Sequence, residues 1–182
     1  MGSCLDDSGC HRACGEEASE SFASLREHQI RVSETRFKFV RPITVAFRDI
    51  DGMRHVNHAQ YLTYCEAVRN EYWMVMTGIT RVEEFDFVLA EVTARYQAPA
   101  FLGDNLIVGC RVNEIRRSSF LIEHEILNAQ SGALIAEVRS AQVMIDTVTG
   151  KSIPMTDLRR KQIEAYEGRA LTVLTSKSRT IS

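Results

Sequence analysis

One long segment with helical spacing, placed before a run of strand-like segments, constrains the fold of this chain more than any other feature. Between His58 and Met76, apolar residues recur at helical spacing, which predicts an amphipathic helix about five turns long. Gly78 is placed to end this helix. The apolar stripe consists of Tyr61, Cys65, Val68, Tyr72, Val75 and Met76. Because a helix with one apolar face must bury that face, the rest of the chain has to supply a covering layer.

Alternating apolar residues predict that this layer is a β-sheet. One alternating segment, Ile43 to Phe47, precedes the helix. Four more follow it, at residues 88–96, 106–112, 120–126 and 133–145. In the first of these four, the residues expected on one face are Val88, Ala90, Val92, Ala94 and Tyr96. Successive strands joined by short turns pair antiparallel, so the sequence predicts an α+β hotdog fold, with a sheet of about five strands wrapped around one long helix. A short helix capped by Thr156 or Asp157 is expected to follow the sheet.

The two ends of the chain differ from this patterned centre. Residues 1–35 are polar and acidic and are predicted to form a flexible tail, and residues 169–182 are predicted to be loose. The hotdog domain is therefore expected at residues 36–168. The N-terminal segment lacks the apolar stretch of a signal peptide and is too acidic for a transit peptide, so a cytoplasmic protein is expected.

Composition excludes several classes of protein. A net charge of −2 without a basic stripe argues against a nucleic-acid partner. No run approaches the ~20 apolar residues that span a bilayer, so membrane association is not expected. Of the five cysteines, Cys65 and Cys110 lie in periodic segments and are expected to pack as small apolar side chains. The other three lie near His11 in the tail without a second ligand pair at finger spacing, so no metal site is predicted.

The stretch between the first strand and the long helix carries the chemistry. Asp49 and Asp51 follow the strand, and the turn His55-Val56-Asn57 leads into the helix at His58. A carboxylate beside the N–H groups of a helix start can act on an electrophilic carbonyl. The N–H groups stabilise the oxyanion, while the carboxylate attacks the carbonyl or activates water.

These residues, together with Glu114-Ile115-Arg116-Arg117-Ser118-Ser119-Phe120, resemble the hotdog-fold thioesterases of the 4-hydroxybenzoyl-CoA thioesterase type. That family includes bacterial acyl-CoA thioesterases, and plant acyl-ACP thioesterases are relatives. The resemblance covers roughly Arg41 to Gly168 and implies an enzyme that hydrolyses acyl thioesters. It also implies that Asp51 is the catalytic carboxylate, that Asp49 supports the turn, and that the N–H of His58 polarises the thioester carbonyl.

The same resemblance supplies the remaining site residues. His55 and Asn57 match residues of the acyl-ACP branch and of many bacterial members, and Tyr61 belongs to the matched motif at the helix start. The residues that match a turn near the phosphates of coenzyme A are Arg116, Arg117, Ser118 and Ser119. Arg54 replaces the family's usual Gly before the His, where Gly would tolerate a positive φ.

The residues leave several alternatives open. Asp51 can serve as a nucleophile or as a general base. His55 and His58 with Asp51 imitate a zinc ligand set, but the family implies no metal and no cofactor beyond coenzyme A as part of the substrate. Glu66 is expected to pair with Arg69 rather than to assist catalysis.

The sequence also leaves open the substrate carrier and the type of activity. The substrate can be an acyl-CoA or an acyl carrier protein thioester, and a hydratase or a non-catalytic acyl-CoA binder on the same fold is an alternative. His124 is expected to be a hydrogen-bonded histidine of the core or of an interface. Because a sheet of this size has edges to cover, a homodimer or homotetramer is predicted.

Overall fold

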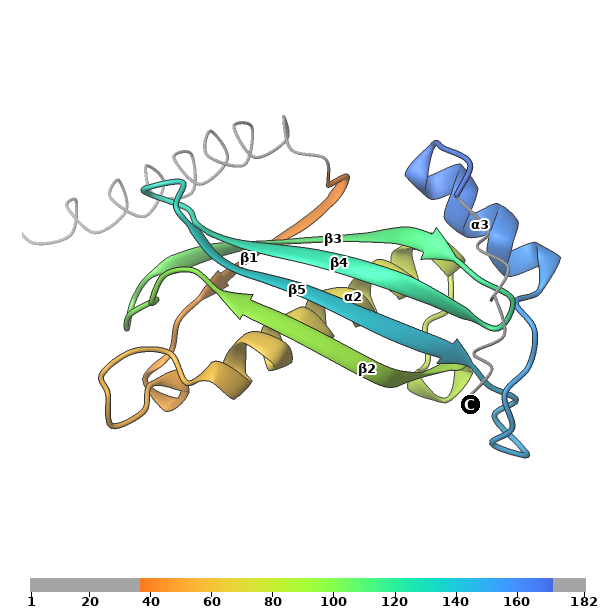
Figure 1. Cartoon of the computed structure of the whole chain (residues 1–182), viewed down its shortest axis with the longest axis horizontal. Coiled ribbons are helices and arrows are strands. Elements are labelled where there is room, and N and C mark those ends of the chain that lie inside the picture. The colour runs from red at the N-terminus through yellow and green to blue at the C-terminus, as the bar shows by residue number, and fades with distance from the viewer. Residues whose placement is uncertain (1–36, 172–182) are drawn as a thin grey trace, which may run out of the picture. The chain divides into compact units, whose positions relative to one another are not determined.

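The predicted order of elements is confirmed. The structure, a computed structural model, describes residues 37–171, so the predicted N-terminal tail and residues 172–182 lie outside the described range. Its elements are β1 (Phe39–Thr44), η1 (Phe47–Asp49), α2 (His58–Thr77), η2 (Val82–Glu84), β2 (Phe87–Tyr96), β3 (Asn105–Ile115), β4 (Ser119–Asn128), β5 (Leu134–Met144) and α3 (Asp157–Glu167). All neighbouring strands pair antiparallel, in the order β1-β3-β4-β5-β2. The sheet lies across α2, as the hotdog prediction requires (Figure 1).

The predicted end of α2 and the predicted start of α3 are confirmed. The Asn57 side chain caps the start of α2, and Gly78 ends it with a φ of 75°. Such a φ suits glycine, which carries no Cβ. Thr156, one of the two predicted capping residues, accepts from the N–H of Arg159 at the start of α3.

The first strand differs from its prediction. β1 ends at Thr44, and the chain then bends into η1, so Phe47 does not continue the strand and is 81% exposed. The cause lies in the Asp49 side chain, whose Oδ2 accepts from the N–H of Ala46 at 2.9 Å. This local hydrogen bond competes with the ladder and turns the chain away from the sheet.

The predicted face of β2 is wrong in its first half. A register shift between Leu89 and Glu91 leaves Ala90 outside the pairing with β5. Leu89 and Val92 therefore lie on the inner face, towards α2, whereas Val88 points to the other side. An alternation read from sequence cannot anticipate a bulge, because one extra residue reverses the face of every residue before it.

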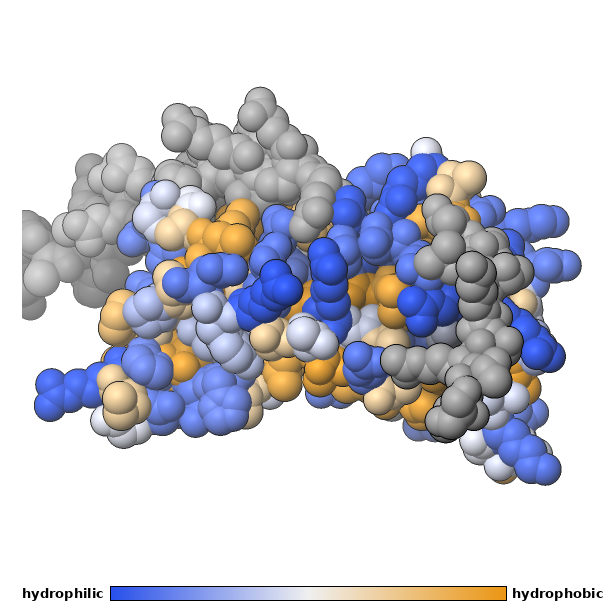
Figure 2. Space-filling model, in the orientation of Figure 1, coloured by the Kyte–Doolittle hydropathy of each residue, from blue (hydrophilic) through white to orange (hydrophobic). Residues whose placement is uncertain are grey.

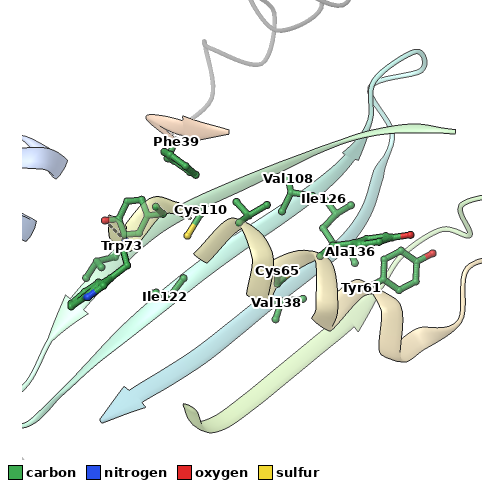
Figure 3. Packing of buried hydrophobic residues seen from close by; sticks show 14 of the residues in the cluster. Phe39, Tyr61, Cys65, Trp73, Val108, Cys110, Ile122, Ile126, Ala136 and Val138 are labelled. Carbon is green, nitrogen blue, oxygen red and sulfur yellow. Dashed lines mark hydrogen bonds between the residues drawn. The ribbon is translucent and has the colours of Figure 1, made fainter. Parts of the chain in front are cut away.

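Aromatic side chains of α2 fill the space between helix and sheet. Trp73 is fully buried and stacks on Phe120 with ring centroids 4.9 Å apart, while Phe87 meets it edge-on at 5.0 Å. Tyr72 is also fully buried, and its hydroxyl donates to Glu167 at 2.6 Å. Figure 3 shows this layer, with Tyr61, Cys65 and Trp73 of α2 facing the strands. Of the predicted stripe only Val75, which is 57% exposed, lies outside the core.

The two cysteines of the domain behave as predicted. Cys65 and Cys110 are buried free thiols. Burial raises the pKa of Cys65 to about 12 and also raises the pKa of Cys110, so both thiols stay protonated. They pack as small apolar side chains.

His124 is buried but not hydrogen-bonded, contrary to expectation. It lies on the inner face of β4 between Cys110 and Val138 and is 3% exposed. Among residues 37–171, neither ring nitrogen has a partner in hydrogen-bonding geometry. Burial and the nearby Arg69 guanidinium lower the pKa of His124 to about 3, although the backbone carbonyl of Cys65 acts in the opposite direction. The ring is therefore neutral at physiological pH.

This histidine predicts a pH-dependent stability. Between its ordinary pKa near 6.5 and the folded value of about 3, the unfolded chain binds a proton that the folded chain does not. Stability is then lost as the pH falls through this window. We expect His124→Leu to remove the effect. The free energy of unfolding of His124→Leu minus that of wild type should therefore increase by about 2 kcal/mol as the pH falls from about 7 to about 5. Urea unfolding of both proteins measures this difference, and parallel pH profiles would contradict it.

Candidate active site

Asp49 anchors the turn that leads into α2. It is 6% exposed, and besides the N–H of Ala46 its Oδ2 accepts from the hydroxyl of Tyr64 at 2.7 Å. Its backbone carbonyl accepts from the N–H of Asn57 at 2.9 Å. Burial and the Asp49 carboxylate together raise the pKa of Tyr64, so the phenol keeps its proton and donates it. One residue thus connects the segment after β1, the turn before α2 and the second turn of α2.

Asp51 lies half-buried two residues further on. Its Oδ1 accepts from the N–H of Met53 at 2.8 Å, and its Oδ2 accepts from Nδ2 of Asn57 at 3.3 Å. The backbone closes around it, since the N–H of Asp51 donates to the carbonyl of His55 at 3.1 Å and the N–H of Arg54 donates to the carbonyl of Asp51 at 2.9 Å. These bonds hold the carboxylate in one orientation and leave it partly open to solvent.

Asn57 joins this carboxylate to the helix start. Its Oδ1 accepts from the N–H of Ala59 at 2.9 Å while its Nδ2 reaches Asp51. The N–H of His58 is one of the first helical donors that have no acceptor inside the helix. The His58 ring is exposed, and its backbone carbonyl accepts from the hydroxyl of Tyr96 at 3.0 Å. The Asp51 carboxylate and the capping side chain of Asn57 are therefore joined at the start of α2, where the N–H of His58 follows in the chain.

The histidines do not form a metal set with Asp51. His55 is half-buried, and its Nδ1 lies 3.3 Å from the carbonyl of Val56, inside the turn. Within the described part of the chain, no group of three or more His, Cys, Asp or Glu side chains is arranged to hold a metal ion.

Arg54 adopts the conformation that its position in the motif demands. Its φ is 65°, and it is the one non-glycine residue with positive φ among residues 37–171. For a residue with a Cβ this left-handed conformation costs roughly 1–2 kcal/mol. The turn geometry is therefore retained although glycine is absent, at the expense of local strain.

The arginine turn lies far from Asp51 in the same chain. β3 begins at Asn105, next to the residues that pair with Val45, and runs for 11 residues to Ile115. At about 3.3 Å per residue it spans roughly 35 Å. Figure 1 shows the loop before α2 at one end of the sheet and the β3–β4 turn at the other. One protomer does not bring these two predicted parts of the site together.

Of the two arginines in that turn, Arg116 is hydrogen-bonded through its side chain, whereas Arg117 is exposed to solvent. Nε of Arg116 donates to Oε1 of Glu114 at 2.6 Å. The backbone carbonyls of Ser118 and Ser119 accept from Met144 and Arg116, which fixes the turn.

Tyr61 shapes the site from inside the core. It is 4% exposed, and its hydroxyl accepts from the N–H of Ala100 at 3.2 Å. Its ring packs between those of Tyr64 and Tyr96. Tyr61 therefore packs against the aromatic side chains near the start of α2, and its hydroxyl is already hydrogen-bonded to Ala100.

Sequence reasoning missed a groove between α2 and the edge strand β2. This groove has a volume of about 120 Å³ and is lined in part by Leu62, Thr63, Leu89 and Val92. Glu66 and Arg69 lie along it and pair at 3.5 Å, as predicted. An edge strand with apolar residues on its inner face was the available signal, but the bulge in β2 concealed which residues those are.

A second hollow lies on the opposite face of the sheet. It measures about 510 Å³ and is lined mainly by charged side chains, among them Glu91, Arg95 and Arg139. Figure 2 looks onto this face, where hydrophilic residues gather over the middle of the sheet. It faces away from α2 and from the helix start that holds Asp51.

Comparison with known proteins identifies the family. A family model for the thioesterase-like superfamily matches residues 45–163, which include the whole predicted site. The chain belongs to this superfamily. The predicted hotdog thioesterase is thereby confirmed at the level of the family.

Individual members of the superfamily are similar over most of the domain. The acyl-CoA thioesterase YbgC of Helicobacter pylori is 32% identical over 90 residues, which cover 50% of this chain and 68% of the relative. The long-chain acyl-CoA thioesterase FadM of Escherichia coli is 25% identical over 123 residues, covering 63% of this chain and 89% of FadM. A thioesterase of Thermus thermophilus, solved with coenzyme A and zinc, is 33% identical with a TM-score of 0.69, covering 74% of this chain and 98% of that one.

No helix within residues 37–171 has the length and apolar character needed to cross a bilayer.

The strained turn generates a prediction about stability. Arg54→Gly should relieve the positive φ and raise the free energy of unfolding by about 0.5–1 kcal/mol, with activity retained. Urea unfolding measures the change. Met53→Gly is the matched control, because the neighbouring Met53 is 74% exposed and has no positive φ, so glycine there should destabilise the protein. Equal effects of the two substitutions would contradict the strain at Arg54.

Proposed function

We propose that the protein hydrolyses an acyl-CoA to the free acid and coenzyme A, with Asp51 as the carboxylate that acts on the thioester. The observation that carries this proposal is the helix start, where Asp51 is held by the N–H of Met53 and by Asn57 beside the free N–H of His58. The names of the relatives, acyl-CoA thioesterases of Helicobacter pylori and Escherichia coli, support the substrate class.

The chemistry follows from this arrangement. The thioester oxygen accepts from the N–H of His58, where the helix dipole favours the negative charge that develops on this oxygen as the carbon becomes tetrahedral. A new C–O bond forms as the C–S bond breaks, and the leaving thiolate takes up a proton. Asp51 either removes the proton from the attacking water or attacks the carbonyl itself to give an anhydride that water then opens. These steps require no metal or cofactor, and coenzyme A enters as part of the substrate.

A dimer supplies the missing end of the site in this proposal. β2 is an edge strand of 10 residues, and Val88 on it is 45% exposed. Pairing two β2 edges around a twofold axis makes them antiparallel, so opposite ends of the two sheets come together. The partner's β3–β4 turn then lies at the same end of the joined sheet as Asp51. We infer that Arg116 and Arg117 bind the phosphates of the coenzyme A held by the other subunit.

The central prediction concerns Asp51→Asn, which removes the charge and keeps the size of the side chain. We expect kcat for thiol release to fall by about 100-fold or more, because this is the scale of a lost general base. A chromogenic thiol reagent with a panel of acyl-CoAs measures it. Glu83→Gln in η2 is the control and should leave the rate unchanged. Equal rates for wild type and Asp51→Asn would make Asp51 structural.

Isotope labelling distinguishes the two proposed roles of Asp51, nucleophile and general base. A single turnover in ¹⁸O-water that places the label in the Asp51 side chain requires the covalent anhydride, whereas a general base leaves the side chain unlabelled. If no acyl-CoA is hydrolysed, thioesters of acyl carrier protein are the next substrates, because His55 and Asn57 also match that branch.

The shared site predicts complementation between variants. Arg117→Ala should raise KM with little change in kcat, since the arginine contacts the leaving group far from the reacting carbon. Mixing the Asp51→Asn and Arg117→Ala proteins should restore turnover at low substrate concentration, because one of the two sites in a mixed dimer then has both residues. No recovery in a verified mixed dimer would place both residues in the same subunit's site. Size-exclusion chromatography with light scattering gives the assembly state.

A further inference from the structure

We propose that the groove between α2 and β2 receives the acyl chain and that its buried end selects chains bearing a hydroxyl group remote from the thioester. This inference rests on the proposed function and adds a substrate class to it. The observation behind it is a set of buried polar groups at that end, on α2 and β4, whose hydrogen-bonding capacity the protein does not satisfy.

The walls of the groove suit an alkyl chain. Leu62 lies on the α2 side, and Leu89 and Val92 lie on the β2 side, where they are 48% and 39% exposed. The bulge in β2 puts Leu89 on the same face as Val92, towards α2, so edge pairing through the backbone of β2 leaves both side chains in the groove. The groove follows α2 away from the helix start that holds the thioester.

The far end of the groove is reached at Arg69. This residue lies 11 positions after His58, which is a rise of about 16 Å along the helix. A chain extending from the thioester must therefore be of medium or long length to reach it. Shorter acyl groups would end among the apolar walls.

Arg69 is a buried cation with few partners. Its side chain is 9% exposed, and among residues 37–171 it has one ion pair, to the Glu66 carboxylate at 3.5 Å, which is itself 63% exposed. The Phe87 ring lies 5.5 Å from the guanidinium carbon. Nε has no hydrogen-bond acceptor among the described residues. Because a buried guanidinium is costly to leave unsatisfied, an acceptor at this position would be stabilising.

His124 lies in the lining of the same groove and is unsatisfied as well. Both of its ring nitrogens are buried and unpartnered within residues 37–171, and the ring is neutral. A neutral imidazole offers one donor and one acceptor. Ser140, the other buried polar residue of the lining, is already bonded to Gln142 at 2.8 Å. By hydrogen-bond geometry, the residues at this end of the groove thus contain two unpartnered donors, Nε of Arg69 and the ring N–H of His124, and one unpartnered acceptor, the other ring nitrogen.

A hydroxyl group fits this set better than the alternatives. Its oxygen accepts from Nε of Arg69, and its proton is donated to the unprotonated ring nitrogen of His124. A carboxylate cannot donate to that nitrogen and would meet the charge of Glu66. An unsubstituted alkyl terminus leaves all of these groups unpaired, and sites with unpaired polar groups discriminate strongly against the analogue that lacks the hydroxyl.

The experiment compares three acyl-CoAs of equal, medium-to-long chain length: unsubstituted, hydroxylated towards the far end, and carboxylated at the far end. We expect wild-type kcat/KM to favour the hydroxylated chain over the unsubstituted one by about tenfold or more. His124→Leu should abolish or invert this preference. Ile122→Val is the control, since it alters the inner face of β4 outside the groove lining and should keep the preference.

Each outcome decides the matter. Turnover without a preference for the hydroxylated chain, or a preference that survives in His124→Leu, overturns the hydroxyl selection and leaves the proposed function intact. If none of the acyl-CoAs is hydrolysed, the proposed function fails. The groove is then tested by calorimetric titration of the same protein with the free hydroxylated and unsubstituted acids. Tighter binding of the hydroxylated acid that is lost in His124→Leu supports the groove, and equal binding overturns it.

Discussion

The buried carboxylate of Asp49 is the interaction on which the rest of the structure depends. By accepting from Ala46 and Tyr64 it ends β1, creates the bend of η1 and ties that bend to α2. Its backbone carbonyl fixes Asn57, so the same residue also sets where α2 begins. A buried charged acceptor has to keep its donors, because each lost bond would leave an uncompensated group. The position of the helix relative to the sheet, and hence of the core between them, follows from this requirement.

The helix start serves both stability and chemistry. Asn57 caps α2 with one side-chain atom and orients Asp51 with the other, so the cap that every helix needs also positions the proposed catalytic carboxylate. The strained φ of Arg54 belongs to the same turn, between Asp51 and Asn57. Six residues bring a carboxylate to an N-terminal dipole, and the turn can be this tight only if one residue adopts the left-handed conformation.

The remaining parts of the site lie beyond this loop. The turn that we propose to bind the phosphates is at the other end of the sheet, so in this proposal a second subunit supplies Arg116 and Arg117. The groove beside α2 has apolar walls and an unsatisfied polar end at Arg69 and His124. A purely structural core would be expected to replace such groups with apolar ones at little cost or with a gain. Their presence in a groove that leads to the helix start is the reason to assign them a role in selecting the acyl chain.

The sequence by itself determined the periodic elements, their order and the local motif. The helix from His58, the antiparallel strands and the meeting of Asp51, Asn57 and the His58 N–H are properties of nearby residues, and the family match added the enzyme class. Tertiary structure decided what depends on pairing between distant residues. The bulge that turns Leu89 towards α2, the end of β1 at Thr44 and the separation of Asp51 from Arg117 are set by strand register. The unpaired state of His124 depends in turn on which side chains surround it, since a pattern of apolar and polar residues specifies a face but not the partners that meet on it.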